Sequence, residues 1–204
     1  MKRSLWNLYA WSLKDVILAS ILSVFFAVIC FTTVHSVVFV VTPIVAPFGF
    51  GDIAIEFVFG IFFMSAVFSA YIIQKPGVAT IVGTMTGLIQ VLMGSAFAST
   101  LIVSALVQGL GAEFIFAVTR YKRFNIVTVL LAAVGPTVTS FVLAWYRGLW
   151  FELDIWFVAT RFIIRLISAL VFSGAKNYIK NPRRKEITAV VMPLPHYDLP
   201  LLLW

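Results

Sequence analysis

Apolar residues dominate six stretches of the chain, and short segments with polar residues, glycine or proline separate them. Each stretch is close to the roughly 20 residues that a helix needs to cross the hydrocarbon core of a bilayer. The third is the shortest, and its Gly83 and Gly87 indicate close packing or a broken helix. The pattern predicts an all-α integral membrane protein, a bundle of six transmembrane helices. The six stretches are residues 16–39, 53–73, 78–92, 98–119, 126–145 and 155–175.

The composition supports this class and limits the number of domains. Hydrophobic residues make up 62% of the chain and charged residues 11%, a balance that soluble globular domains do not have. The length of 204 residues leaves room for one bundle, which we expect to cover residues 1–180. A cytoplasmic tail, residues 181–204, follows it. Three prolines in this tail, Pro193, Pro195 and Pro200, argue against a helix there.

The charged residues outside the six stretches predict the orientation. In a six-span bundle the basic clusters all fall on one side: Lys2, Arg3 and Lys14; Lys75; Arg120, Lys122 and Arg123; and Lys176, Lys180, Arg183, Arg184 and Lys185. The opposite side holds Asp52, Glu152, Asp154 and Arg147. By the positive-inside rule we expect both termini in the cytoplasm. The net charge of +7 therefore reflects topology and anionic lipid, and does not indicate nucleic-acid binding.

Residues that carry enzymatic or metal chemistry are sparse. The single cysteine, Cys30, cannot form a disulfide within the chain, and His35 and His196 lie far apart in the sequence. The chain has no HExxH or CxxC spacing and no phosphate-binding glycine loop of the Walker type. We therefore expect no enzyme, no bound metal and no cofactor.

Four charged residues lie inside the apolar stretches, namely Glu56, Glu113, Arg161 and Arg165. A charge at the centre of a bilayer costs roughly 2.5–3.5 kcal/mol on insertion scales, so each should be paired or used. Glu113 lies about 22 Å into its stretch, past the midplane, and Arg165 lies near the middle of the last one. One interpretation is a structural ion pair between Glu113 and Arg165 that locks two helices together.

The alternative is a ligand site lined by polar and aromatic side chains from several stretches. Polar side chains within membrane spans generally face the bundle interior or a water-filled cavity. Glu113 would lie in this site or support it, and depth favours Glu56 and Gln108 over Glu113 as direct contacts. The candidate lining residues are Glu56, Gln90, Gln108, Glu113, Tyr146 and Trp150.

The first stretch also carries a stripe of small residues, Ala19, Ser23 and Ala27, at a spacing of four. Such stripes let helices approach each other closely. The stripe predicts either an internal helix contact or a docking face for a separate membrane protein, and the spacing alone does not decide between them.

Several short motifs resemble the YkoE family. They are Lys75-Pro76-Gly77, the segment from Gln108 to Glu113, Thr119-Arg120-Tyr121-Lys122 and Arg165-Leu166-Ile167-Ser168. Members of this family are substrate-capturing S components of energy-coupling factor (ECF) transporters, associated with thiamine or its hydroxymethylpyrimidine precursor. The similarity extends over about residues 14–177. The chain departs from the family pattern at Gln90, where similar sequences often carry a carboxylate, and at Ser95.

The resemblance implies a six-helix subunit that captures a vitamin on the outer side of the plasma membrane. It would assemble with a transmembrane coupling protein and two ATPase subunits, and the small-residue stripe would contact the coupling protein. A carboxylate or amide suits the aminopyrimidine ring, and an aromatic face suits the thiazolium cation. The external aromatic candidates are Trp145, Tyr146, Trp150 and Trp156.

Three other functions stay open on the sequence. The chain could capture another small vitamin, such as a B6 vitamer or riboflavin. It could be a stand-alone secondary transporter in which Glu113 and the two arginines, Arg161 and Arg165, carry coupling protons. It could also be a scaffold or sensor in which the Glu113 pair is purely structural.

Overall fold

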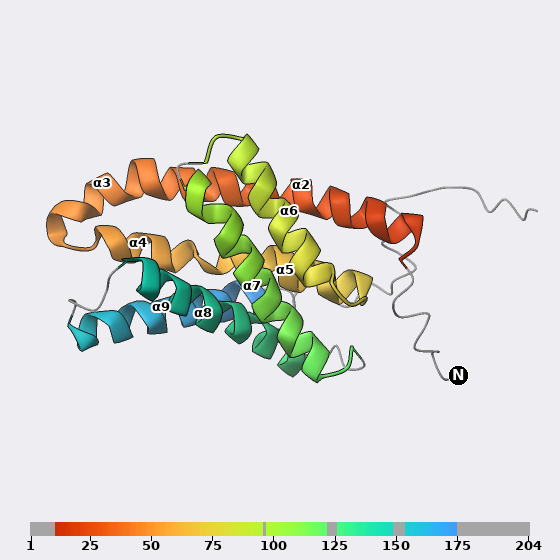
Figure 1. Cartoon of the computed structure of the whole chain (residues 1–204). Coiled ribbons are helices and arrows are strands. Elements are labelled where there is room, and N and C mark those ends of the chain that lie inside the picture. The colour runs from red at the N-terminus through yellow and green to blue at the C-terminus, as the bar shows by residue number, and fades with distance from the viewer. Residues whose placement is uncertain (1–10, 96, 122–125, 149–153, 175–204) are drawn as a thin grey trace, which may run out of the picture.

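The computed structural model describes residues 11–95, 97–121, 126–148 and 154–174, and every regular element in these ranges is helical. The helices pack side by side in one bundle, with the chain reversing direction between neighbours (Figure 1). The elements are α2 (Leu13–Ser36), the π-helical turn η1 (Val37–Val41), α3 (Thr42–Val45), the 3-10 turn η2 (Ala46–Phe48), α4 (Gly51–Val58), α5 (Gly60–Ile73), α6 (Val78–Leu92), α7 (Ala98–Val118), α8 (Ile126–Gly148) and α9 (Ile155–Gly174).

The prediction of an all-α membrane protein with six apolar segments is confirmed at the level of helices. Five helices in the described residues are long and apolar enough to cross a membrane, and α6 is a shorter apolar helix of 15 residues. Each of these six helical runs coincides largely with one predicted stretch. The orientation of the bundle in the membrane stays a prediction.

The first span is longer than its sequence pattern predicted. Helical structure continues from Leu13 to Phe48, a run of 36 residues, instead of ending near Phe39. A capping box starts it, because the Ser12 hydroxyl accepts a hydrogen bond from the backbone N–H of Asp15 and the Asp15 carboxylate accepts one from that of Ser12. Pro43 has no N–H to donate, and the helix passes through the π-helical turn just before it. The segment then turns back into α4 (Figure 1).

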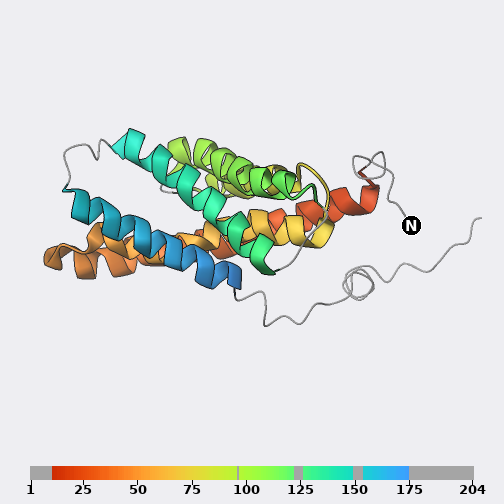
Figure 2. The ribbon, with the colours of Figure 1, turned by 90° about the horizontal axis from the view of Figure 1, so that it is seen from below.

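The second span runs over residues 53–73 as the sequence predicted, with one break in its α-helical hydrogen bonds at Phe59, whose backbone torsions (φ −61°, ψ −28°) stay helical. α4 ends at Val58 and α5 begins at Gly60, and both elements contact α9. Seen from below, α9 runs along this pair (Figure 2). The break lies beside the cavity described below, which Phe59 lines.

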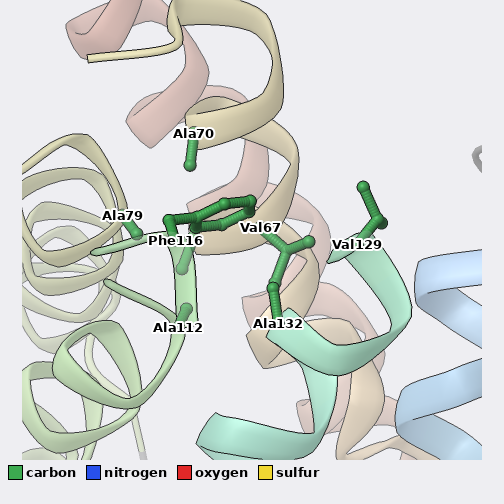
Figure 3. Packing of buried hydrophobic residues seen from close by; sticks show 8 residues of the cluster. Val67, Ala70, Ala79, Ala112, Phe116, Val129 and Ala132 are labelled. Carbon is green, nitrogen blue, oxygen red and sulfur yellow. The ribbon is translucent and has the colours of Figure 1, made fainter. Parts of the chain in front are cut away.

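The hydrophobic core lies in the half of the bundle where α7 ends. Phe116 of α7 is fully buried and is surrounded by small and branched side chains from three other helices (Figure 3). Small residues at these contacts let the helix backbones approach closely. The half of the bundle where α7 begins is less tightly filled, and it holds the cavity. The cluster consists of Ala66, Val67, Ala70, Ala79, Ala112, Phe116, Val129 and Ala132.

Candidate functional site

A cavity of about 380 Å³ lies between α4, α5, α7, α8 and α9. This volume is within the range of small-molecule sites, which are mostly apolar with a few placed polar groups. The surface exposed in it is mostly apolar, although polar residues also contribute to the wall. The polar lining residues are Glu56, Thr100, Ser104, Gln108, Ser140, Arg147, Arg161 and Arg165.

A buried ion cluster forms one wall of the cavity. Glu56 of α4 is fully buried and faces two arginines of α9, one helical turn apart. Its Oε2 accepts a hydrogen bond of 2.5 Å from Arg165 Nε, and its Oε1 accepts one of 2.8 Å from Arg165 Nη2. Arg161 donates to the same Oε1 from Nε at 3.3 Å and from Nη2 at 3.2 Å. The two guanidinium groups thereby engage both oxygens of the carboxylate.

Aromatic rings and a hydroxyl complete the surroundings of Arg165, which is 2% exposed. The guanidinium carbon lies 3.9 Å from the ring centre of Phe59 and 5.5 Å from that of Phe141. These distances are within the range of cation–π attraction. Nη1 also donates to the Ser140 hydroxyl of α8 at 3.4 Å. Arg165 therefore ties α4, α8 and α9 together at the cavity.

Ser168 of α9 holds the broken second span in place. Its hydroxyl donates to the carbonyl of Phe57 at 2.6 Å and accepts from the N–H of Gly60 at 3.0 Å. The two backbone groups at the break are thus satisfied, as irregular backbone inside a membrane requires. Gly60 lies against the Ser168 carbonyl, and a Cβ there would overlap it. This contact, together with the Glu56 ion pairs, fixes the position of α4 over the cavity.

Gln108 lines the cavity from α7, as the sequence predicted for its position. Its Nε2 donates to the Ser104 hydroxyl one turn earlier, at 2.7 Å. Gln90 does not line the cavity. It lies in a narrow adjoining slot of about 10 Å³, which Gln108 also lines, and its Nε2 donates to the carbonyl of Thr86. The slot has the volume of about one water molecule.

The described aromatic candidates near the last external segment are not part of the cavity wall. Tyr146 is 76% exposed and is not part of the cavity wall, so the structure does not support its predicted role as a lining residue. Trp150 lies outside the described residues. The aromatic side chains that do line the cavity are Phe59, Phe62 and Phe97.

The sequence analysis also missed several polar residues of the wall. Ser104 lies four residues before Gln108, a spacing that places both on one helix face and could have revealed it. Ser140 and Thr100 carried no comparable signal, because serine and threonine are frequent throughout the apolar stretches. Arg147 was assigned to topology alone, yet its side chain borders the cavity.

The predicted ion pair between Glu113 and Arg165 was wrong, because Arg165 pairs with Glu56. The Glu113 carboxylate accepts hydrogen bonds from the N–H groups of Gly77, Ala79 and Thr80, at 2.7, 3.0 and 3.4 Å. These are donors at the start of α6 that have no partner within the helix. The Tyr121 hydroxyl also donates to Glu113. The negative charge of Glu113 thus lies at the positive, N-terminal end of the α6 dipole. Glu113 is not among the residues that line the cavity.

The small-residue stripe is an internal contact in this structure. Ala19, Ser23 and Ala27 are at most 5% exposed. Ala19 belongs to a buried cluster with α5 and α6, and the backbone carbonyl of Ser23 accepts a hydrogen bond from Thr86 of α6. The docking interpretation is contradicted, because α2 presents this stripe to its own bundle and leaves larger side chains such as Phe25 exposed.

Comparisons with known proteins identify the family. Residues 14–139 match the family model described as "ABC-type cobalt transport system, permease component". The chain is 32% identical over 171 residues to the "Putative HMP/thiamine permease protein YkoE" of Bacillus subtilis (strain 168), covering 81% of this chain and 80% of that protein. A solved structure titled "Crystal structure of an S-component of ECF transporter" matches with a TM-score of 0.74 at 30% identity, over 89% of this chain and 86% of that one. The chain belongs to the YkoE family of multi-pass membrane transport proteins, and it is an S component of the ECF type and not an enzyme.

Proposed function

We propose that this protein captures hydroxymethylpyrimidine (HMP) or thiamine from outside the cell for ATP-driven uptake. The observation that carries the proposal is the cavity of about 380 Å³ between membrane helices, lined by a buried ion cluster and by Gln108. A relative of 32% identity is named as an HMP/thiamine permease. The cobalt in the family description does not suit this cavity, since a divalent cation would meet Arg147, Arg161 and Arg165 there.

Recognition of the aminopyrimidine falls mainly to Gln108. Its amide nitrogen is directed at Ser104, and its carbonyl oxygen is the acceptor that we assign to the amino group of the ligand. Phe62 and Phe97 supply flat apolar surface for the ring. Glu56 has a different role from the one expected for a direct contact, because its oxygens bind Arg161 and Arg165 and hold the wall in shape.

The same proposal includes the orientation of the bundle in the membrane and its partner proteins. With both termini in the cytoplasm, α7 begins on the outside, and the cavity beside its first half lies in the outer half of the membrane. Energy then comes from a transmembrane coupling protein and two ATPase subunits, since the sequence carries no phosphate-binding loop of the Walker type. In this proposal residues 1–180 form the capture domain and residues 181–204 form the cytoplasmic tail. The tail lies outside the described residues.

Titration of the purified protein with HMP and with thiamine, followed by intrinsic tryptophan fluorescence, tests the proposal. Gln108→Leu keeps the side-chain volume but removes the acceptor. We expect it to weaken binding about three- to tenfold, the value of one neutral hydrogen bond. Tyr146→Phe is the matched control, because this exposed side chain is outside the cavity wall and the variant should bind normally. Absence of binding at micromolar concentrations of both ligands would refute the proposal.

A further inference from the structure

We infer that the second half of α8 is a hinged gate of the cavity, which turns at Pro136 and is latched to α7 by Arg147. The inference rests on the proposed function and concerns how a ligand enters and leaves its site. The gate consists of residues 137–148, the part of α8 that follows the proline. Its residues that line the cavity are Ser140, Leu143, Ala144, Arg147 and Gly148.

The first half of α8 is fixed against α7 and the hydrophobic core. Gly135 lies so close to Gly111 of α7 that a Cβ on either glycine would overlap backbone atoms of the other helix. Val129 and Ala132 belong to the buried cluster around Phe116. Such close packing of small residues leaves this half of the helix no room to move. A motion of α8 therefore begins after Gly135.

Pro136 follows this fixed point directly and weakens the helix there. It has no N–H, so the carbonyl of Ala132 one turn earlier loses its usual donor, and helices commonly bend at such a residue. The Thr139 hydroxyl is within hydrogen-bond distance of three acceptors at this point, at 3.2–3.3 Å. They are the carbonyls of Val107 in α7 and of Gly135 and Pro136 in α8. Since one hydroxyl proton can serve any of them, a change of angle at the hinge exchanges one bond for another at little cost.

The latch lies near the C-terminal end of the gate. Arg147 Nη1 donates to the carbonyl of Thr100 at 3.3 Å, and both residues line the cavity. Arg147 is exposed, so water can replace this hydrogen bond when it opens. On the α7 side, Ser104 and Gln108 line the cavity between the latch and the hinge. Opening of the latch therefore frees the seam between α7 and α8 beside the ligand.

On its other side the gate rests on α9. The ring of Phe141 packs edge-on against Phe162, with ring centres 4.9 Å apart, and its centre lies 5.5 Å from the guanidinium carbon of Arg165. Phe141 is buried, and these apolar and cation–π contacts hold the gate to α9. Because the latch on the α7 side is exposed, we expect the α7–α8 seam to open while the contact with α9 persists.

A cysteine inside the cavity tests the gate without a ligand. Ser104→Cys in a Cys30→Ala background gives the full chain one thiol, on the cavity wall. The rate at which N-ethylmaleimide labels it in detergent reports how often the gate opens. Pro136→Ala restores the N–H and stiffens the helix, so labelling should slow about three- to tenfold, the value of one hydrogen bond. Arg147→Gln removes the charged donor of the latch and should accelerate labelling by a similar factor.

Stopped-flow tryptophan fluorescence with thiamine then follows the entry and exit of a ligand. Arg147→Gln should raise the association and dissociation rate constants together, because opening of a gate precedes both steps. Pro136→Ala should lower both. Loss of a direct ligand contact would instead raise the dissociation rate constant alone. Arg120→Gln removes an equal charge beyond the other end of α7 and is the matched control, which should change neither the rate constants nor the labelling.

The inference is overturned if Pro136→Ala folds but labels as fast as the parent, or if Arg147→Gln raises only the dissociation rate constant. Equal acceleration of labelling by Arg120→Gln and Arg147→Gln would also overturn it. If Pro136→Ala does not fold, Arg147→Gln decides the question by itself. If neither thiamine nor HMP binds, the proposed function fails, while the labelling of Ser104→Cys still decides whether the gate opens at this seam.

Discussion

Glu56, Arg161 and Arg165 act as one electrostatic unit, and none of the three fits the membrane interior by itself. Burial of a lone charge is expensive, but a carboxylate bound by two guanidinium groups has its charge compensated at 2.5–3.3 Å. The unit also joins α4 to α9 and contacts α8 through Ser140. The unit holds the cavity wall in shape, and in the proposed function this sets the geometry in which Gln108 and the phenylalanines would meet a ligand.

Substitution of Glu56→Gln should destabilise the protein strongly. It leaves two buried guanidinium groups without their carboxylate, and breaking a buried pair costs about 3–5 kcal/mol. The measurement is the loss of folded protein on heating in detergent. Glu56→Gln combined with Arg165→Met should recover part of the loss, because the uncompensated charge is then removed. Equal stability of Glu56→Gln and the native chain would contradict the role assigned to the cluster.

Glu113→Gln should lower stability without changing ligand affinity. The amide loses the negative charge that three N–H groups at the start of α6 bind, and hydrogen bonds to a charged group are worth about 1.5–3 kcal/mol each. Thermal melting and ligand titration of the same preparation separate the two effects. Weaker binding at an unchanged melting temperature would instead place Glu113 in the ligand site.

At the scale of elements, the break in the second span lies beside the cavity and is held by α9. At the break, Ser168 of α9 supplies hydrogen bonds in place of those that the helix lacks there. Gly60 permits this because it has no Cβ to collide with the α9 backbone.

Gly60→Ala should therefore impair both folding and binding. The added methyl group would overlap the Ser168 carbonyl, so α5 and α9 would have to move apart beside the cavity. We expect a lower melting temperature and a loss of ligand affinity. Gly83→Ala is the control, since its Cβ would lie 3.5 Å from the nearest atoms, an ordinary contact, and alanine is the better helix former. Similar behaviour of the two variants would remove the special role of the break.

At the scale of the whole molecule, the bundle divides into a packed half and a half with the cavity. The packed half holds Phe116 and the cap at Glu113, and there Lys75 also forms an ion pair with Asp15 of α2 at 2.5 Å. In the proposed function, the end with the cavity receives the ligand. The proton-coupled alternative loses its main candidate here, because Glu113 is bound to the start of α6.

Single-cysteine labelling should reveal the orientation of the bundle. Cys30 is buried, so Cys30→Ala provides the background for new cysteines at two exposed positions. With both termini inside, Met93→Cys after α6 should react with a membrane-impermeant maleimide on intact cells. Arg120→Cys after α7 should react only after the membrane is opened. The reverse pattern would show that the positive-inside assignment is wrong.

The sequence by itself determined the class, the number and approximate bounds of the apolar helices, and the set of polar residues that need partners. These are properties of single segments, since hydropathy and length decide whether a helix enters a bilayer. It also singled out Gln108, which lines the cavity. Only the tertiary structure decided which partner each charge takes. Glu56 and Glu113 are the same residue type, so the sequence does not distinguish their partners. The rotation and depth of their helices place Glu56 against two arginines and Glu113 against the N–H groups of α6. The break before Gly60 was likewise decided by Ser168, which lies more than a hundred residues away in the chain, and no local pattern records that contact.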